Sequence, residues 1–256
     1  MLFTQTKTTV CVNRRRKPTL MISDTQNHAL LTVGHAAAHS PAWAGYAAYC
    51  VAREQGLRKE AFAHLAAFLT QAKQWSLDER IAFACFLFPF LETVEDADYG
   101  PFPQPLSAQL AKPTLQQWCA LEPADARPFR WFGRYYRDQD ALLHALAVDP
   151  HDDTARQTLL GWWRDALYFS VHHLPDGYIG HPEDDLVLGE RARAHIDRLT
   201  SPERRAYWTQ ELEEDLELVR NYVEWKDSGH PDLARWGMEQ HKRVGYNGGA
   251  TYYYEK

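Results

Sequence analysis

Apolar residues recur with a helical period along most of the chain, and no run alternates strictly as a surface strand would. The pattern predicts a succession of helices joined mostly by short loops. The predicted helices cover 41–55, 58–75, 77–91, 115–120, 128–136, 140–148, 154–174, 182–199, 202–226 and 231–241. Because short loops make successive helices antiparallel neighbours, we expect an all-α fold of antiparallel helix hairpins stacked as an irregular α-α superhelix.

One predicted helix is apolar on nearly every side. Ser76 and Glu79 have the spacing of a capping box, and the run IAFACFLFPFL follows at 81–91. This run, interrupted by Pro89, is far shorter than the ~20 residues of a membrane span. It therefore predicts a buried helix with neighbours on two faces, and we expect no membrane association.

The chain divides by composition into three parts. Residues 1–22 are basic and lack periodicity, residues 23–244 form a single predicted helical-repeat domain, and residues 245–256 form a tail rich in glycine and tyrosine. Within the domain, the segment YGPFPQP at 99–105 breaks the helical pattern, because prolines and glycine favour loops. We expect a joint near 97–113.

Charge is unevenly distributed along the chain. The formal net charge is −6, yet residues 1–23 carry five basic residues and no acid, which leaves −11 for residues 24–256. The basic segment is either an arm for an anionic partner or a stretch that precedes a natural start at Met21. Its missing periodicity favours the second interpretation. The folded part is acidic in both cases, so we expect no nucleic-acid binding.

Composition is typical of a globular protein of a reducing compartment. The hydrophobic and charged fractions, 45% and 24%, are ordinary, whereas aromatic residues reach 13% and could supply an interface as well as a core. The four cysteines lack CxxC spacing, and the N-terminus lacks the apolar run of a secretory signal. We therefore expect a cytoplasmic location.

The segment 131–160 resembles the tetratricopeptide repeat. Trp131, Gly133 and Tyr136 match the first-helix pattern of a large residue, then glycine, then tyrosine, and ALAVDP at 145–150 matches the end of the second helix. The unit is shorter than the 34-residue period, and no second full copy aligns elsewhere. The resemblance implies a degenerate tetratricopeptide-like stack of helix hairpins.

A cluster of histidines and acids occupies 172–185, inside a segment, 166–188, that resembles part of an uncharacterised bacterial family of helical proteins. Imidazoles and carboxylates are ligands for divalent metals. The adjacent His172 and His173, however, diverge by about 100° on a helix, so they do not easily share one ion. The turn sequence Pro-Asp-Gly at 175–177, followed by acids in the first turn of the next helix, favours a helix-to-helix corner instead.

Other candidate chemistry is weaker. His35 and His39 are spaced i, i+4 and would share a face if helical, but further ligands are missing, so they are weak metal candidates. We find no nucleophile elbow, cysteine signature or phosphate-binding glycine loop, and we expect no cofactor. The acids at 211–217 indicate a solvated face or, alternatively, a recognition face for a basic partner.

These observations favour a protein–protein interaction module with an acidic helical surface over an enzyme. One version is a bacterial immunity protein or adaptor that binds a basic protein. The alternative is a metal-dependent hydrolase that uses the cluster at 172–185, and a third reading is a solenoid that acts as a homo-oligomer. The candidate partner-binding residues are His172, His173, Asp176, Tyr178, His181, Glu183, Asp184, Asp185, Glu213 and Glu214.

Overall fold

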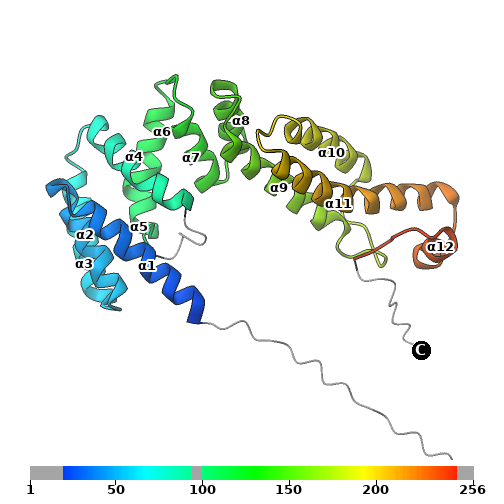
Figure 1. Cartoon of the computed structure of the whole chain (residues 1–256), viewed down its shortest axis with the longest axis horizontal. Coiled ribbons are helices and arrows are strands. Elements are labelled where there is room, and N and C mark those ends of the chain that lie inside the picture. Colours follow the sequence, from blue (N-terminus) through cyan, green and yellow to red (C-terminus); the bar gives the residue numbers. More distant parts are fainter. Residues whose placement is uncertain (1–19, 94–99, 247–256) are drawn as a thin grey trace, which may run out of the picture. The chain divides into compact units, whose positions relative to one another are not determined.

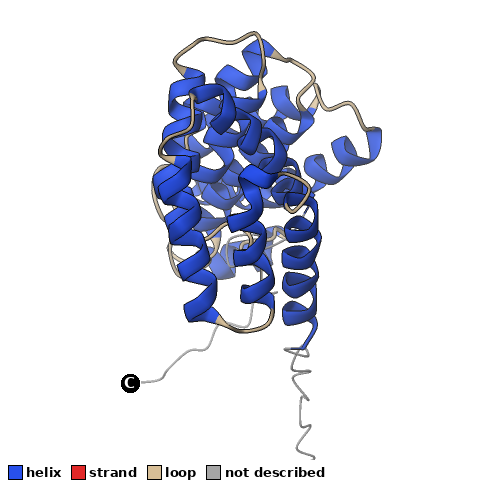
Figure 2. Cartoon of the chain, turned by 90° about the vertical axis from the view of Figure 1, so that its left-hand side faces the viewer, coloured by secondary structure: helices blue, strands red, loops and turns tan. Residues whose placement is uncertain are grey.

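Every regular element among the described residues is a helix, which confirms the predicted all-α class (Figure 1, Figure 2). The computed structural model describes residues 20–93 and 100–246, and side chains in the first helix are described from residue 28 onward. The first elements are α1 (Leu20–Ala37), the 3-10 turn η1 (Pro41–Trp43), α2 (Ala44–Glu54), α3 (Arg58–Ala72), α4 (Leu77–Thr93), α5 (Gln104–Leu106), the π-helical η3 (Ser107–Ala111) and α6 (Lys112–Cys119). The later ones are α7 (Arg127–Tyr136), α8 (Gln139–Val148), α9 (Asp153–Val171), α10 (Pro182–Ile196), α11 (Pro202–Ser228) and α12 (Leu233–Gln240).

The chain forms two compact units, Met1–Gln117 and Trp118–Lys256. The division falls inside α6, a few residues beyond the segment 97–113 in which a joint was expected. Each unit has its own apolar core, so each is described by itself.

In the first unit, α2 packs against both α1 and α3. The approach of α1 to α2 is close at Gly34, where an added Cβ would lie only 2.9 Å from the Cβ of Cys50. The core is aromatic: the ring centroids of Tyr46, Phe68 and Phe83 lie 5.2–5.8 Å from one another. Aromatic pairs at this spacing add to the stability that their burial provides.

Two buried tyrosines of α2 hold the chain that leads into α5. The hydroxyl of Tyr46 donates to the carbonyl of Pro101, and that of Tyr49 donates to the carbonyl of Gly100, each at 2.7 Å. Both bonds satisfy carbonyls that have left the helical ladder. The loop predicted from its prolines is therefore fixed to the core at this point.

Helix α4 has the buried character that its sequence predicts. The capping box is present: the Ser76 backbone N–H donates to Glu79 Oε2 at 2.7 Å, and the Glu79 N–H donates to Ser76 Oγ at 3.3 Å. Its buried residues are Phe83, Ala84, Leu87, Phe88 and Leu91, while Pro89 lies inside the helix and is exposed.

Two helical segments differ from the expectation. Helix α1 begins at Leu20, within the segment predicted as an extension, and was not predicted because its buried positions include small residues such as Gly34 and Ala37. Helix α5 begins at Gln104, inside the segment predicted as loop, because Pro105 occupies the first turn, where a missing N–H costs nothing.

The second unit contains a larger core built by α7 to α11. Helix α7 packs on α8, α8 on α9, and α9 on both α10 and α11. Fully buried side chains at this centre include Leu142, Leu159 and Leu216. Two glycines permit close approach: an added Cβ at Gly133 would lie 2.5 Å from Leu142 Cγ, and one at Gly189 would lie 2.6 Å from Leu216 Cδ2.

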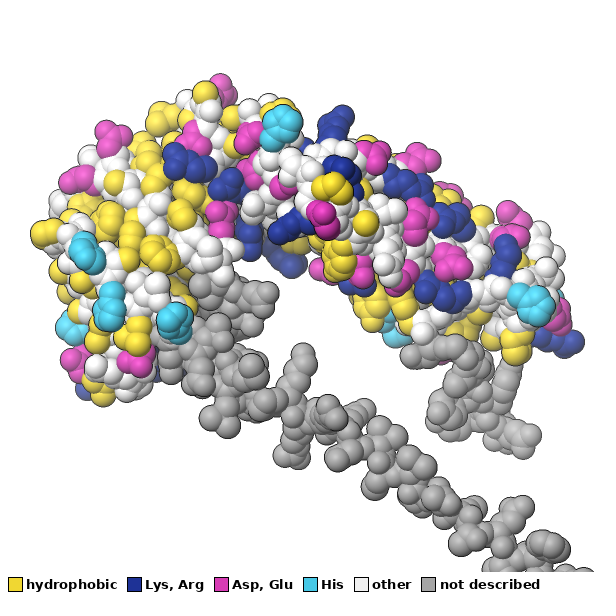
Figure 3. Space-filling view, viewed as in Figure 1, with side chains coloured by type: hydrophobic (Ala, Val, Ile, Leu, Met, Phe, Trp, Pro, Cys, Tyr) yellow, Lys and Arg dark blue, Asp and Glu magenta, His cyan; other side chains and the backbone are white. Residues whose placement is uncertain are grey.

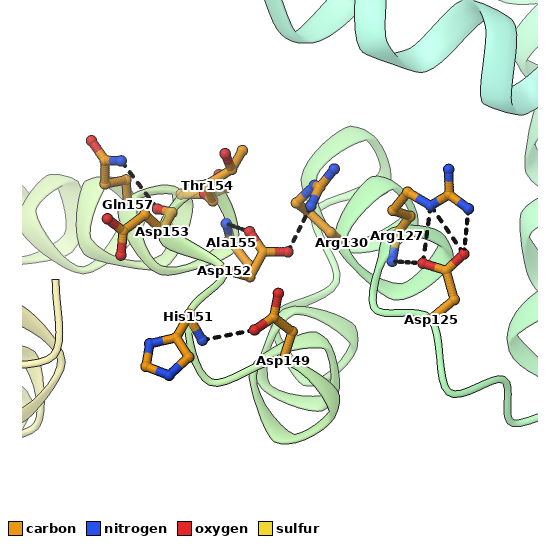
Figure 4. A network of polar contacts seen from close by, with 11 residues as sticks. Asp125, Arg127, Arg130, Asp149, His151, Asp152, Asp153, Thr154, Ala155 and Gln157 are labelled. Carbon is orange, nitrogen blue, oxygen red and sulfur yellow. Dashed lines mark hydrogen bonds and ion pairs between the residues drawn. The ribbon is translucent and has the colours of Figure 1, made fainter. Parts of the chain in front are cut away.

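A polar network joins the ends of α7 and α9 (Figure 4). Asp152 is the N-cap of α9: its Oδ1 accepts from the Ala155 N–H at 2.9 Å. Its Oδ2 accepts from Arg130 of α7 at 2.7 Å. Asp152 is 6% exposed, so this ion pair is largely shielded from water and fixes α7 against the start of α9.

A smaller core lies where α9 ends. It contains Val171, Leu218, Leu233 and Trp236, which brings α12 against α9 and α11. After α12 the chain returns along α11, and the side chain of Asn221 donates to the Arg243 carbonyl at 2.7 Å. The segment just before the predicted tail is thus held against α11.

Candidate interaction surface

The predicted cluster at 172–185 forms the turn between α9 and α10. His172 follows the last residue of α9, and its Nδ1 lies 2.8 Å from the Phe169 carbonyl. The Ile179 N–H donates to the Ser170 carbonyl at 2.9 Å, which folds the turn back onto α9. These contacts are those of a helix-to-helix corner.

Within this corner, Tyr178 and Asp185 form the closest side-chain pair. The Tyr178 hydroxyl donates to Asp185 Oδ2 at 2.5 Å, and the Tyr178 ring stacks on Tyr222 of α11 with centroids 4.5 Å apart. Burial, followed by the bond to Asp185, raises the pKa of Tyr178 well above its usual range. The Tyr178 hydroxyl therefore stays protonated at neutral pH, and the pair joins the turn to α10 and α11.

The remaining residues of the cluster are exposed to solvent. His181 is the N-cap residue of α10. Glu183 and Asp184 lie exposed in its first turn, where the helix dipole stabilises acidic side chains. Asp176 is exposed in the turn. Across the described part of the chain, no group of three histidines, cysteines or acids could hold a metal ion.

The weak metal candidates are not on one helical face. His35 lies in the last turn of α1, which ends at Ala37, and His39 lies beyond that end. The Nδ1 of His39 is 3.3 Å from the Ala36 carbonyl.

An exposed aromatic surface covers the last turns of α9. We use this name for Tyr168, Phe169, His172, His173 and Tyr246. Tyr168, Phe169 and Tyr246 are 44%, 58% and 37% exposed. Ring centroids link them: Tyr168 to Tyr246 at 5.2 Å, Tyr168 to His172 at 5.5 Å, Phe169 to His172 at 5.4 Å and His172 to His173 at 4.0 Å. The five rings therefore form one contiguous patch.

Two arginines flank the aromatic surface. The guanidinium of Arg164 lies 5.9 Å from the ring centroid of Tyr168, and that of Arg243 lies 5.8 Å from that of Tyr246. Arg243 also donates to the Glu214 carbonyl. Cation–π contacts of this kind hold aromatic rings in place while leaving their outer faces open.

A buried carboxylate anchors one edge of the surface. Asp215 of α11 is fully buried, accepts a hydrogen bond from the Tyr246 hydroxyl, and has its Oδ2 3.6 Å from the Nε of Arg164. Burial raises the pKa of Asp215, while the bond from Tyr246 and the charge of Arg164 oppose that change. Tyr246 is therefore fixed to α11.

The acidic run of α11 is compensated by arginines. Glu213 pairs with Arg193 of α10 at 2.6 Å and with Arg220 at 2.9 Å. Glu211 pairs with Arg164, and Glu217 with Arg243, at 3.0 and 3.3 Å. The Glu214 carboxylate accepts from the side chain of Gln210. Figure 3 shows the result, since acidic and basic side chains alternate over the second unit on the face in view.

Sequence reasoning placed two members of the aromatic surface, His172 and His173, among the candidates and missed the others. Arg164, Tyr168 and His172 are spaced i, i+4, i+8, so a stripe on one face of α9 was readable from the sequence. Tyr246 carries no such signal, because it reaches the stripe only through the return of the chain after α12.

Comparisons with known proteins return nothing: no family model, no curated protein and no solved structure matches the chain. Among the described residues, no helix combines the length and the apolar character needed to cross a membrane.

Proposed function

We propose that the protein is a protein–protein interaction module and that it binds its partner through the aromatic surface. In this proposal its helix hairpins stack as an irregular, tetratricopeptide-like superhelix that presents the surface on rigid elements. The supporting observation is the exposure of Tyr168 and Phe169 within one contiguous group of rings. Aromatic side chains bury much area with few rotatable bonds, so they dominate many binding interfaces.

The aromatic surface supports this function better than the acidic run does. Four arginines compensate most of the carboxylates of α11 between 211 and 217, so a basic partner would have to displace existing ion pairs. Exposed pairs of this kind contribute little, about 0–1 kcal/mol each, and a partner that replaced them would gain little. An immunity protein or adaptor of the expected kind would therefore recognise its partner mainly through rings.

The chemistry of the surface defines the partner. His172 and His173 add hydrogen-bonding nitrogen atoms beside the rings of Tyr168 and Phe169. At the edge of the aromatic surface, Arg164 and Arg243 already form ion pairs with acids of α11. We expect a protein that inserts apolar side chains between the rings and surrounds them with hydrogen-bonding groups.

The test is affinity capture from the native host with three forms of the full chain. Wild type and Tyr207→Ala should retain the same stoichiometric partner, because Tyr207 is a comparably exposed tyrosine, at 56%, outside the surface. The double variant Tyr168→Ala/Phe169→Ala should lose the partner. With the purified partner we expect at least about tenfold weaker binding, as for a central aromatic anchor.

Circular dichroism checks that the double variant keeps its helices, as expected for two exposed positions. Equal capture by all three forms would place the interface elsewhere. Absence of any stoichiometric partner with the wild-type chain would count against an interaction module.

A further inference from the structure

Three arginines and one histidine gather on the other side of the second unit's core, where α9 begins and α10 ends. We call Arg156, Arg191, His195 and Arg198 the cationic cluster. Arg156 lies in the first turns of α9, Arg191 and His195 lie on α10, and Arg198 follows its last residue. The group stands out in a chain whose formal net charge is −6.

Arg156 is buried without a carboxylate partner. It is 1% exposed, one Nη lies 3.4 Å from the Nδ1 of His195, and the other donates to the carbonyl of Pro150. Its Nε has no hydrogen-bond partner among the described residues. Arginines are almost never fully buried unless paired, and an unpaired buried charge is costly.

Two other arginines of this unit are paired with acids. Arg130 pairs with Asp152, and Arg164 pairs with Glu211. The acids nearest to Arg156 are engaged elsewhere, because Asp152 serves Arg130 and caps α9, and Asp153 accepts from the side chain of Thr200. Burial lowers the pKa of Arg156 and the charges of Asp153 and Asp152 oppose that change, yet neither carboxylate forms an ion pair with Arg156 in the described part of the chain.

The two outer arginines add to this charge. Arg191 lies over the ring of Trp163, 4.8 Å from its centroid, and the His195 ring meets the same indole edge-on at 5.0 Å. Both Arg191 and Arg198 are exposed, and neither forms an ion pair with an acid among the described residues. Their donors are free to face a ligand from solvent.

His195 responds to this environment by remaining neutral. Burial, followed by the charges of Arg156, Arg198 and Arg191, lowers the pKa of His195 to about 4. A neutral ring with Nδ1 toward Arg156 leaves its other nitrogen available for a hydrogen bond.

We propose that the cationic cluster binds a dianionic phosphate group, as free phosphate or as a small phosphate monoester. Arg191 and Arg198 donate hydrogen bonds to its oxygens, and the free nitrogen of His195 adds a further hydrogen bond. The buried positive charge of Arg156 attracts the anion electrostatically. Guanidinium groups match phosphate geometry and form strong, charge-assisted hydrogen bonds with it. A charge of −2 offsets the local positive charge of the cationic cluster.

The first test follows the imidazole of His195 by NMR during titration with inorganic phosphate, at constant ionic strength. We expect a saturable shift of its resonances below about 10 mM phosphate. Because a bound phosphate anion of either charge favours the protonated ring, the pKa of His195 should also rise when phosphate is saturating. A pKa of His195 that does not move at saturating phosphate would overturn the site.

The second test measures phosphate affinity by calorimetry in matched variants. Arg191→Gln and Arg198→Gln should each weaken binding about tenfold, the loss of one charge-assisted contact. Arg193→Gln is the control, because it removes the same charge from the same helix but at a residue that pairs with Glu213. Equal weakening by the control would show a general charge effect and overturn the site.

A third arm distinguishes the two sources of the phosphate group. An alkyl phosphate that binds more tightly than inorganic phosphate identifies a phosphate monoester, since the extra affinity comes from contacts beyond the phosphate. Equal affinities identify free phosphate. An alkyl phosphate that does not compete with inorganic phosphate would show that the two do not share this site, contrary to the proposal.

Discussion

Three buried charged residues of the second unit, Asp152, Asp215 and Arg156, differ in how their charges are held. Asp152 and Asp215 each accept a hydrogen bond from another residue and lie within ion-pair distance of an arginine, so each has a defined partner of opposite charge. Arg156 lacks such a partner and lies instead beside His195, a ring that stays neutral. The two aspartates hold helices together. The charge of Arg156 has no ion-pair partner and can act on a bound anion, which is the basis of the proposed phosphate site.

The lowered pKa of His195 predicts a specific pH dependence of stability. Between the ordinary pKa of 6.5 and the folded-state pKa of about 4, the unfolded chain binds a proton that the folded chain does not. Acid therefore favours unfolding. The stability that the folded protein has while His195 is neutral is fully present above about pH 6.5 and is lost as the pH falls toward 4. In phosphate-free buffer, chemical denaturation should show this decline.

His195→Gln should flatten the decline, because the variant has no imidazole to protonate at this position. His151→Gln serves as the control, since His151 is exposed. A His195→Gln variant whose stability depends on pH as steeply as that of the wild type would contradict the prediction.

At the scale of elements, glycines set how closely the helices approach. Gly133 packs against Leu142. A Cβ added at Gly133 would also lie 2.9 Å from the carbonyl oxygen of Asp138, so no larger side chain fits there. Gly161 of α9 differs, because an added Cβ there would meet only Trp208, at an ordinary 3.8 Å. The same residue type thus has opposite roles in neighbouring helices.

Alanine substitutions should separate these roles. Gly133→Ala forces α7 away from α8 and should lower the free energy of unfolding by about 2 kcal/mol. Gly161→Ala should raise it by up to about 1 kcal/mol, since alanine is the better helix former. Urea denaturation of both variants checks the signs, and a stabilising Gly133→Ala would refute the close contact.

The ion pair between α7 and α9 makes a second prediction at this scale. Asp152→Ala removes both the cap of α9 and the shielded ion pair with Arg130, whose side chain is 17% exposed, so it should cost about 3 kcal/mol. Asp152→Asn keeps an acceptor for the cap and should cost less. Thermal unfolding compares the two.

Asp125→Ala is the matched control for this network (Figure 4). Asp125 also pairs with an arginine at 2.7 Å, but its partner, Arg127, is 49% exposed and only two residues away. The control should change stability by no more than about 1 kcal/mol. If it matched Asp152→Ala, burial would not be what gives the α7–α9 pair its strength.

For the molecule as a whole, surface chemistry matters more than net charge. The formal charge of −6 suggests an acidic protein, yet the acids of α11 are largely matched by arginines from three other segments. What remains distinctive on the second unit is one patch of exposed rings and one group of uncompensated cations. The proposed functions follow these two features, each of which can be tested without disturbing the other.

The sequence alone determined the helical class, most of the helix positions and several helix ends. Periodicity of 3.6 residues, the capping box at Ser76 and Glu79, and the proline that opens α11 are local signals, and local backbone physics decides them. The sequence did not predict α1, where small residues weaken the apolar stripe, and it did not predict the start of α5.

The tertiary structure decided which residues act together. Tyr246 joins Tyr168, and Arg156 joins His195, across 78 and 39 positions of the chain. No periodicity encodes such pairs, because they depend on how α12 turns the chain back and on how α10 packs against α9. The pairing of the α11 acids with distant arginines has the same origin, so a run of carboxylates that suggests an acidic surface in sequence is close to neutral in the folded molecule.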